Sequence, residues 1–194
     1  MRIKFATALV VAGLTAFSAS TFSAQAAEPD NTMIITLKDG DVTIALRPDL
    51  APQHVARIKE LVREGAYDNV AFHRVIEGFM AQTGDVQFGD MKEGFAPERA
   101  GTGGSDKPDL PAEFSKVPFE RGVLGMARSQ DPNSANSQFF IMFTQYPSLN
   151  GQYTVVGEVE KGMDLVDKIK RGAGGNGEVS DPDRMVKVRI AGDK

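Results

Sequence analysis

The chain has 194 residues and no cysteine, and its 22 Lys and Arg against 26 Asp and Glu give a formal net charge of −4. This acidic balance argues against a nucleic-acid partner, because nucleic-acid recognition depends on clustered Lys and Arg. Without thiols the chain has no disulfides, no cysteine nucleophile and no cysteine-based zinc site.

Residues 1–26 have the pattern of a secretory signal peptide. Two cations precede an almost unbroken apolar run over residues 5–19, and Ala24 and Ala26 place small residues where a signal peptidase reads them. The run is shorter than the ~20 residues that a membrane span needs, which favours cleavage near Ala26 over a retained anchor. We therefore expect residues 27–194 to form one compact domain that is periplasmic or secreted, with no stable membrane insertion after cleavage.

The first part of the mature chain predicts a hairpin followed by a helix. β-rich segments at residues 33–37 and 42–46 flank an Asp-Gly pair, which is typical of a hairpin turn. From Pro52, apolar residues recur at spacings of three and four as far as Gly65. This spacing predicts an amphipathic helix with proline in its first turn.

The rest of the chain is mostly strand-like. Residues 70–76 and 79–83 predict two strands joined by a turn. Further strand-like segments follow at residues 122–127, 138–143, 153–159 and 185–190. A short helix is predicted at residues 163–170, and long loops rich in Gly, Pro and charge cover residues 84–118 and 172–183. Many strands, two helices and no β-α alternation predict a mainly β protein, a closed antiparallel barrel with helical caps.

Metal, cofactor and covalent chemistry are not expected. His54 is expected on the polar flank of the first helix, and neither it nor His73 has a nucleophile or a ligand set beside it. A hydrolase is therefore disfavoured. Residues 172–177 match a dinucleotide-binding glycine pattern by letter, but they follow a helix where that motif needs a strand. We interpret this segment as a flexible loop.

Arg74 is the most informative residue, because it stands in an apolar, strand-like stretch. A charge on an apolar surface is costly unless it is hydrogen-bonded. The nearest acid is Glu77, across a turn at Gly78. Either a distant carboxylate pairs with Arg74, or its guanidinium is kept for a ligand, and the residues themselves leave both alternatives open.

Two amides share these apolar surroundings. Gln82 follows the Arg74 stretch, and Gln138 precedes Phe139 and Phe140, which must face opposite sides of a strand. One face of the sheet is therefore expected to carry an apolar shelf with polar groups at its rim. Such a combination is the usual form of a ligand site, although the same residues also fit a core with a surface ion pair.

Four stretches together resemble the signature of the cyclophilins, a family of peptidyl-prolyl cis-trans isomerases. They read FHRVIEGFMAQTGD at residues 72–85, GTGG at 101–104, GMAR at 125–128 and NSQFFI at 136–141. The resemblance covers nearly the whole mature chain. It implies an eight-stranded antiparallel barrel capped by two α-helices, and catalysis of X–Pro bond rotation in proline-containing segments of unfolded or folding proteins.

The resemblance also implies a role for each site residue. Arg74 would act on the prolyl nitrogen without a covalent intermediate, and Gln82 and Phe140 are the other implied catalytic positions. The implied substrate-binding residues are His73, Phe79, Met80, Ala127, Arg128, Gln138, Leu149 and Tyr153. No metal and no cofactor are implied.

The chain departs from the common family pattern at several positions. Arg128 replaces a frequent asparagine, which is expected to favour acidic substrates, and Tyr153 replaces a frequent pocket histidine. Ser148 stands where the family often has tryptophan, so we expect weak cyclosporin binding with retained activity. Residues 85–100 form a longer loop than in compact eukaryotic members. Exported bacterial members resemble the chain in such substitutions, which supports a periplasmic location for an isomerase of exported proteins.

A second hypothesis is a binding module or chaperone that holds proline-containing segments without turnover. Every position with an implied catalytic role is occupied by the residue that the family uses, which favours the enzyme. Negligible isomerase activity combined with protection of unfolded clients would favour the binding module.

Overall fold

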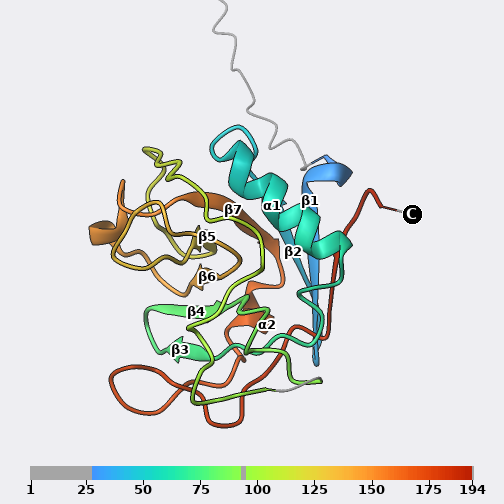
Figure 1. The fold of residues 1–194 in the computed structure, drawn as a ribbon, viewed down its shortest axis with the longest axis vertical. Coiled ribbons are helices and arrows are strands. Elements are labelled where there is room, and N and C mark those ends of the chain that lie inside the picture. The colour runs from blue at the N-terminus through green and yellow to red at the C-terminus, as the bar shows by residue number, and fades with distance from the viewer. Residues whose placement is uncertain (1–27, 93–94, 194) are drawn as a thin grey trace, which may run out of the picture.

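The computed structural model describes residues 28–92 and 95–193, so the predicted signal peptide lies outside the described residues. Eight antiparallel strands form one sheet in the order β3-β4-β6-β5-β7-β2-β1-β8 (Figure 1). The strands are β1 Thr32–Leu37, β2 Gly40–Leu46, β3 Arg74–Ile76, β4 Met80–Thr83, β5 Val123–Met126, β6 Phe139–Met142, β7 Val155–Lys161 and β8 Lys187–Ile190. The helices are α1 Pro52–Arg63 and α2 Met163–Val166, with short 3₁₀ turns η1 Pro29–Asn31 and η2 Pro147–Leu149.

The sheet is open and curled, and closure of the predicted barrel is not confirmed. β3 and β8 stand at the two ends of the strand order and share no ladder among the described residues. Single backbone hydrogen bonds link their neighbourhoods instead: Phe72 N–H donates to Asp183 O at 2.8 Å, and Met185 N–H donates to Val70 O at 2.9 Å. The eight antiparallel strands themselves are confirmed.

Several predicted elements are shorter than expected, and two of them lose about half of their length. The strand predicted at residues 70–76 begins only at Arg74, because Ala71 and Phe72 donate their N–H groups to loop carbonyls and not to a neighbouring strand. The helix predicted at 163–170 ends at Val166. Beyond it, the backbone N–H groups of residues 168 and 169 bond carbonyls three residues back, the tighter 3₁₀ pattern.

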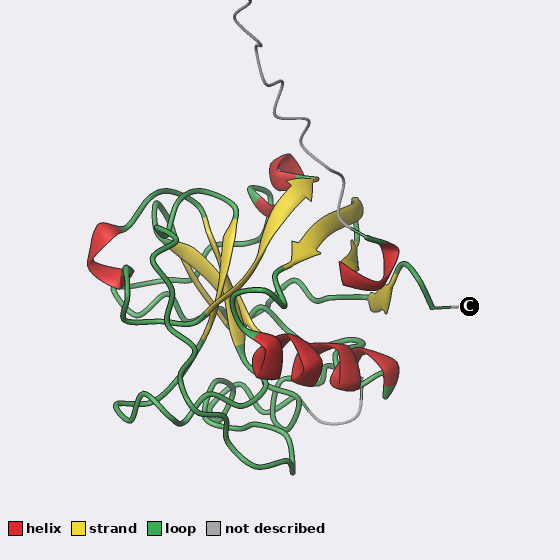
Figure 2. Cartoon of the chain, turned by 90° about the horizontal axis from the view of Figure 1, so that it is seen from above, coloured by secondary structure: helices red, strands yellow, loops and turns green. Residues whose placement is uncertain are grey.

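The helix predicted from Pro52 is confirmed as α1, which lies along one side of the curled sheet (Figure 2). His54 is not on a polar flank as expected: its side chain is fully buried and its Nδ1 lies 2.6 Å from a Glu113 carboxylate oxygen. The same carboxylate accepts the N–H groups of Gln53 and His54. Because α1 has no side-chain cap of its own, this distant loop residue satisfies the first helical donors.

Each face of the sheet carries its own apolar cluster. The larger one packs α1 against the inner face, and the smaller one covers the outer face. β6 contributes to both: Phe139 and Ile141 belong to the larger cluster, while Phe140 and Met142 belong to the smaller. The predicted opposite orientation of Phe139 and Phe140 is therefore confirmed.

Among the helices of the described residues, none combines the length and the apolar character that crossing a bilayer requires.

Candidate functional site

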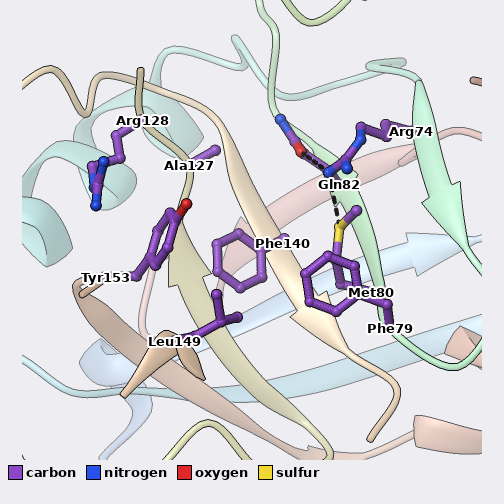
Figure 3. Close-up of a pocket in the computed structure, with 9 residues that line it drawn as sticks. All are labelled: Arg74, Phe79, Met80, Gln82, Ala127, Arg128, Phe140, Leu149 and Tyr153. Carbon is purple, nitrogen blue, oxygen red and sulfur yellow. Dashed lines mark hydrogen bonds between the residues drawn. The ribbon is translucent and has the colours of Figure 1, made fainter. Parts of the chain in front are cut away.

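A cavity of about 210 Å³ opens over the smaller apolar cluster (Figure 3). Strands β3, β4 and β6 supply one part of its wall, and the segments that follow β5 and precede β7 supply the other. The lining residues are Arg74, Phe79, Met80, Gln82, Ala127, Arg128, Phe140, Leu149 and Tyr153. Nine of the residues predicted for the site are thus brought together from five separate segments.

The apolar part of the cavity is held by stacked aromatic rings. Phe140 stacks on Phe119 with ring centroids 5.7 Å apart, and Tyr153 meets Phe140 edge-on at 5.7 Å. Gly125 lies behind this pair: a Cβ there would come within 2.5 Å of Phe140 and 2.6 Å of Phe119. Glycine at this position therefore lets the two rings stack, and the cavity wall has little room to rearrange.

Arg74 stands at the polar edge of the cavity and is held by neutral oxygen atoms. Its Nε donates to the backbone carbonyl of Asn176 at 2.9 Å, and its Nη1 donates to Gln82 Oε1 at 3.3 Å. No carboxylate of the described residues forms an ion pair with it, and Glu77 pairs with Arg171 at 2.6 Å instead. Burial lowers the pKa of Arg74 from its ordinary value, yet arginine stays charged at neutral pH. The guanidinium thus faces the cavity without a charged partner.

A chain of amides links Arg74 to a loop. Gln82 donates through Nε2 to Gln138 Oε1 at 2.9 Å, and Gln138 donates to the carbonyls of Gly101 and Gly103 at 3.0 and 2.8 Å. The carboxylate of Asp85 accepts the N–H groups of the same two glycines. Both amides are therefore fixed in one orientation, and Gln82 has its oxygen free to face Arg74.

Two predicted site residues lie outside this cavity. Gln138 borders an adjacent hollow of about 280 Å³, which shares Gln82, Ala127 and Arg128 with the cavity. His73 is only 5 % exposed and lines a third hollow next to Arg74. Burial lowers the pKa of His73 below its ordinary value, so its ring is neutral at physiological pH.

Arg128 is engaged by its own surroundings. Its Nε and Nη2 donate to the carbonyl of Gln152 at 3.2 and 2.9 Å, and its guanidinium lies 4.5 Å from the centroid of the Tyr153 ring. Both contacts fix Arg128 beside the cavity.

Sequence reasoning missed three residues that shape the site: Phe119, Gly125 as a packing position, and Asn176. Gly125 belongs to the stretch GMAR at residues 125–128 that resembles the family signature, but the sequence does not show that it packs against two aromatic rings. Asn176 acts through a backbone carbonyl 102 residues from Arg74, and no side-chain pattern can signal such a contact. In residues 28–92 and 95–193, no three or more His, Cys, Asp or Glu side chains gather as a metal site would require.

Sequence comparisons with known proteins all match one family of isomerases. The sequence profile of the family described as cyclophilin type peptidyl-prolyl cis-trans isomerase/CLD matches residues 32–191. A probable peptidyl-prolyl cis-trans isomerase of Brucella suis is 65 % identical over 188 residues, which cover 96 % of each chain. The peptidyl-prolyl cis-trans isomerase CYP23 of Arabidopsis thaliana is 38 % identical over 131 residues, 68 % of this chain and 56 % of that protein.

Solved structures show the same likeness. The cyclophilin AquaCyp293 from Hirschia baltica superimposes with a TM-score of 0.72 at 28 % identity, covering 87 % of this chain and 76 % of that one. A cyclophilin-type isomerase from Cryptosporidium parvum, crystallised in the presence of the dipeptide Ala-Pro, gives a TM-score of 0.70 at 27 % identity. That comparison covers 82 % of this chain and 98 % of the other.

Proposed function

The chain belongs to the cyclophilin-type peptidyl-prolyl cis-trans isomerases, and we propose that its isomerase reaction takes place in the cavity beside Arg74, on proline-containing segments of other proteins. The observation that carries this proposal is the cation at the cavity edge. Among the described residues the partners of Arg74 are all uncharged, namely the oxygens of Asn176 and Gln82 and the sulfur of Met80, and Arg74 borders an apolar space that suits a proline ring.

The proposed mechanism uses the charge of Arg74 on the prolyl nitrogen. Rotation about an X–Pro bond is slow because amide resonance imposes a barrier, ~18–20 kcal/mol for an ordinary peptide bond. In the twisted amide the nitrogen lone pair no longer conjugates with the carbonyl, so it becomes an acceptor for a donor held in place. A guanidinium fixed beforehand by Gln82 and the Asn176 carbonyl stabilises this twisted state more than either planar isomer.

The remaining residues of the cavity bind the substrate. Phe79, Met80, Phe140 and Leu149 surround the proline ring, and the backbone of Arg128 holds the residue that precedes proline. A structure from a relative was obtained with an Ala-Pro dipeptide, which supports a proline-containing ligand for this chain as well. No acid–base group is needed, so the rate should depend little on pH near neutrality.

The test is cis–trans exchange of a short X–Pro peptide, measured by NMR with the native protein and with Arg74→Ala. We expect kcat/KM to fall about 100- to 1,000-fold, the range for loss of one donor to a transition state. Arg47→Ala is the matched control, because Arg47 pairs with Asp49 outside the cavity and should leave the rate unchanged. Equal rates for native protein and Arg74→Ala would remove Arg74 from the mechanism. Peptide binding without acceleration in the native protein would favour the binding-module hypothesis.

We propose further that the clients are exported proteins. The support is the residue pattern of the first 26 positions, which lies outside the described residues. Fractionation of cells that produce the full chain, followed by N-terminal sequencing, tests this proposal. A periplasmic or secreted product that begins near Ala27 is expected, and a cytoplasmic product with an intact N-terminus would contradict it.

Weak cyclosporin binding remains part of the proposal. It is supported by Ser148, an exposed residue of η2 next to the cavity-lining Leu149, in the position where the resemblance places a frequent tryptophan of the family. Ser148→Trp should strengthen binding of the drug in a direct titration while leaving the exchange rate of a peptide unchanged.

A further inference from the structure

The third hollow lies next to the proline cavity, across Arg74 and Gln82, which line both. It measures about 300 Å³. Its remaining wall comes from His73, from residues 97–98 and 100–102, and from Asn176 and Glu178. Part of this wall belongs to the long loop after β4, residues 84–118, for which the sequence alone predicts no role.

The rim of this hollow carries two carboxylates without partners. Glu98 and Glu178 are both exposed and line the hollow, and neither makes an ion pair with any described residue. Arg74 is the one cation among the lining residues in the described part of the chain, and its donors are directed at Asn176 and Gln82. The neighbouring Arg99 lies over the Phe88 ring at 3.5 Å. Two negative charges therefore face the hollow against one positive charge.

His73 supplies an independent observation. Both of its ring nitrogens are buried and have no hydrogen-bond partner among the described residues, which is uncommon because such groups are costly to leave unpaired. Its ring edge lies beneath Gly101: a Cβ at that glycine would be 3.0 Å from Cδ2 and Nε2 of the ring. Gly101 itself lines the hollow, so a neutral imidazole lies directly beneath this space.

We propose that this hollow is a second substrate subsite, which takes a Lys or Arg side chain of the client segment that follows the proline. The proposal rests on the proposed function. The two carboxylates are acceptors, and a Lys or Arg side chain provides both the positive charge and the N–H donors that they lack, while the neutral His73 ring adds no competing positive charge.

The position of the hollow gives the direction along the client chain. Arg128 and Ala127 border the proline cavity and the Gln138 hollow, on the side proposed for the residue before proline. The acidic hollow is lined by Arg74 and Gln82 and by neither Ala127 nor Arg128, and it borders the Gln138 hollow through Gln82, Gly101 and Thr102. The hollow shares Arg74 and Gln82 with the proline cavity, and an extended chain advances ~3.3–3.6 Å per residue, so we assign the hollow to the first or second residue after proline.

The experiment compares the affinity of short peptides by NMR titration of the ¹⁵N-labelled protein. The peptides are identical except for Lys or Gln at the first or second position after proline, and a further pair carries Lys or Gln before proline. We expect a Lys after proline to tighten binding roughly two- to fivefold over Gln, as is usual for ion pairs at exposed carboxylates, and less so at high salt. Lys before proline should give no gain.

Two double variants separate the hollow from general charge effects. In Glu98→Gln/Glu178→Gln the preference for Lys should vanish while affinity for the Gln peptide is kept. Glu120→Gln/Glu158→Gln changes the net charge equally at exposed positions away from the hollow and should keep the preference. Any of three results overturns the proposal. The native protein could bind the Lys and Gln peptides with equal affinity, the preference for Lys could survive in Glu98→Gln/Glu178→Gln, or Lys before proline could also tighten binding.

Failure of the subsite and failure of the proposed function give different results. If the Gln peptide is bound and isomerised but Lys brings no gain, only the subsite is wrong. If no peptide is isomerised, the proposed function is wrong, and the affinity ratio still decides whether the hollow binds a cation.

Discussion

At the scale of single residues, the choice of partners for Arg74 determines what it can do. Its acceptors, Asn176 O, Gln82 Oε1 and the more distant Met80 Sδ, are all uncharged, so they orient the guanidinium without cancelling its charge. A carboxylate partner would have compensated that charge before a substrate arrived. The sequence placed Arg74 and Gln82 near each other because both belong to one recognised stretch. It could not decide whether Arg74 pairs with a distant carboxylate or keeps its guanidinium for a ligand. Its partner far along the chain is a backbone atom, the Asn176 carbonyl oxygen, which no side-chain pattern indicates.

The amide chain behind Arg74 leads to a prediction for Gln82. Gln82→Leu keeps the volume of the side chain but removes the acceptor of Arg74 and the donor to Gln138. We expect kcat/KM to fall about 10- to 100-fold, the range for loss of a hydrogen bond to a charged group, with most of the change in kcat. Gln87→Leu, at an exposed position outside the cavity, is the control for peptide exchange rates. An unchanged rate in Gln82→Leu would show that Asn176 alone orients Arg74.

At the scale of elements, the glycine-rich loop at residues 172–177 supports the strand that carries Arg74. Val75 N–H donates to Gly177 O at 2.7 Å, and Gly172 N–H donates to Val75 O at 2.9 Å, so this loop continues the hydrogen bonding of β3 (Figure 1). Gly177 has φ +69°, and a Cβ there would come close to Ile76. The sequence showed that residues 172–177 lack the preceding strand of a dinucleotide-binding motif. Their interpretation as a flexible loop did not include the hydrogen bonds that attach them to β3.

This attachment makes two glycines of the same loop respond differently to alanine. Gly177→Ala should displace the loop from β3 and with it the Asn176 carbonyl, lowering kcat/KM by up to about 100-fold, as misplacement of a catalytic group by ~1 Å does. Gly175→Ala is the matched control, because a Cβ there meets nothing within 4 Å. Peptide exchange rates of the two variants test this, with a melting curve to establish that both are folded. Equal activity of the two variants would mean that the loop does not position Arg74.

At the scale of the whole molecule, strand periodicity was enough to predict the order of the elements, and the resemblance implied eight strands. Periodicity could not predict how the two ends of the sheet meet, because they are linked by backbone bonds between residues such as Phe72 and Asp183, which belong to no regular strand. His54 was placed wrongly for a related reason. A histidine is polar by type, and only its contact with Glu113, 59 residues away, makes its burial favourable.

The Glu113 contact also predicts how stability depends on pH. Burial alone would raise the pKa of Glu113, but hydrogen bonds from the His54 side chain and from the N–H groups of His54 and Gln53 outweigh it and lower the pKa. A carboxyl whose pKa is lowered on folding stabilises the protein above its unfolded pKa of about 4.3, and this contribution is lost as pH falls through the lower folded value.

Glu113→Gln should therefore lower the free energy of unfolding near neutral pH by about 1–3 kcal/mol, because α1 loses charged acceptors for its first donors. Below pH ~4 the difference from the native protein should shrink, since the carboxyl becomes protonated first in the unfolded chain and then, at its lower pKa, in the folded protein. Urea unfolding at several pH values measures both effects, with Glu120→Gln as an exposed control. A difference that stays constant down to pH 3 would contradict this assignment of the acid sensitivity.

The alternation along β6 has a consequence for how such a protein can diverge. Within one four-residue strand, Phe140 and Met142 face the outer cluster beneath the proline cavity, while Phe139 and Ile141 face the cluster that holds α1. Because neighbouring positions face opposite sides, mutation can alter the choice of clients at even-numbered positions while odd-numbered positions preserve foldability. Client specificity and the stability of the fold can thus change nearly independently within a single strand.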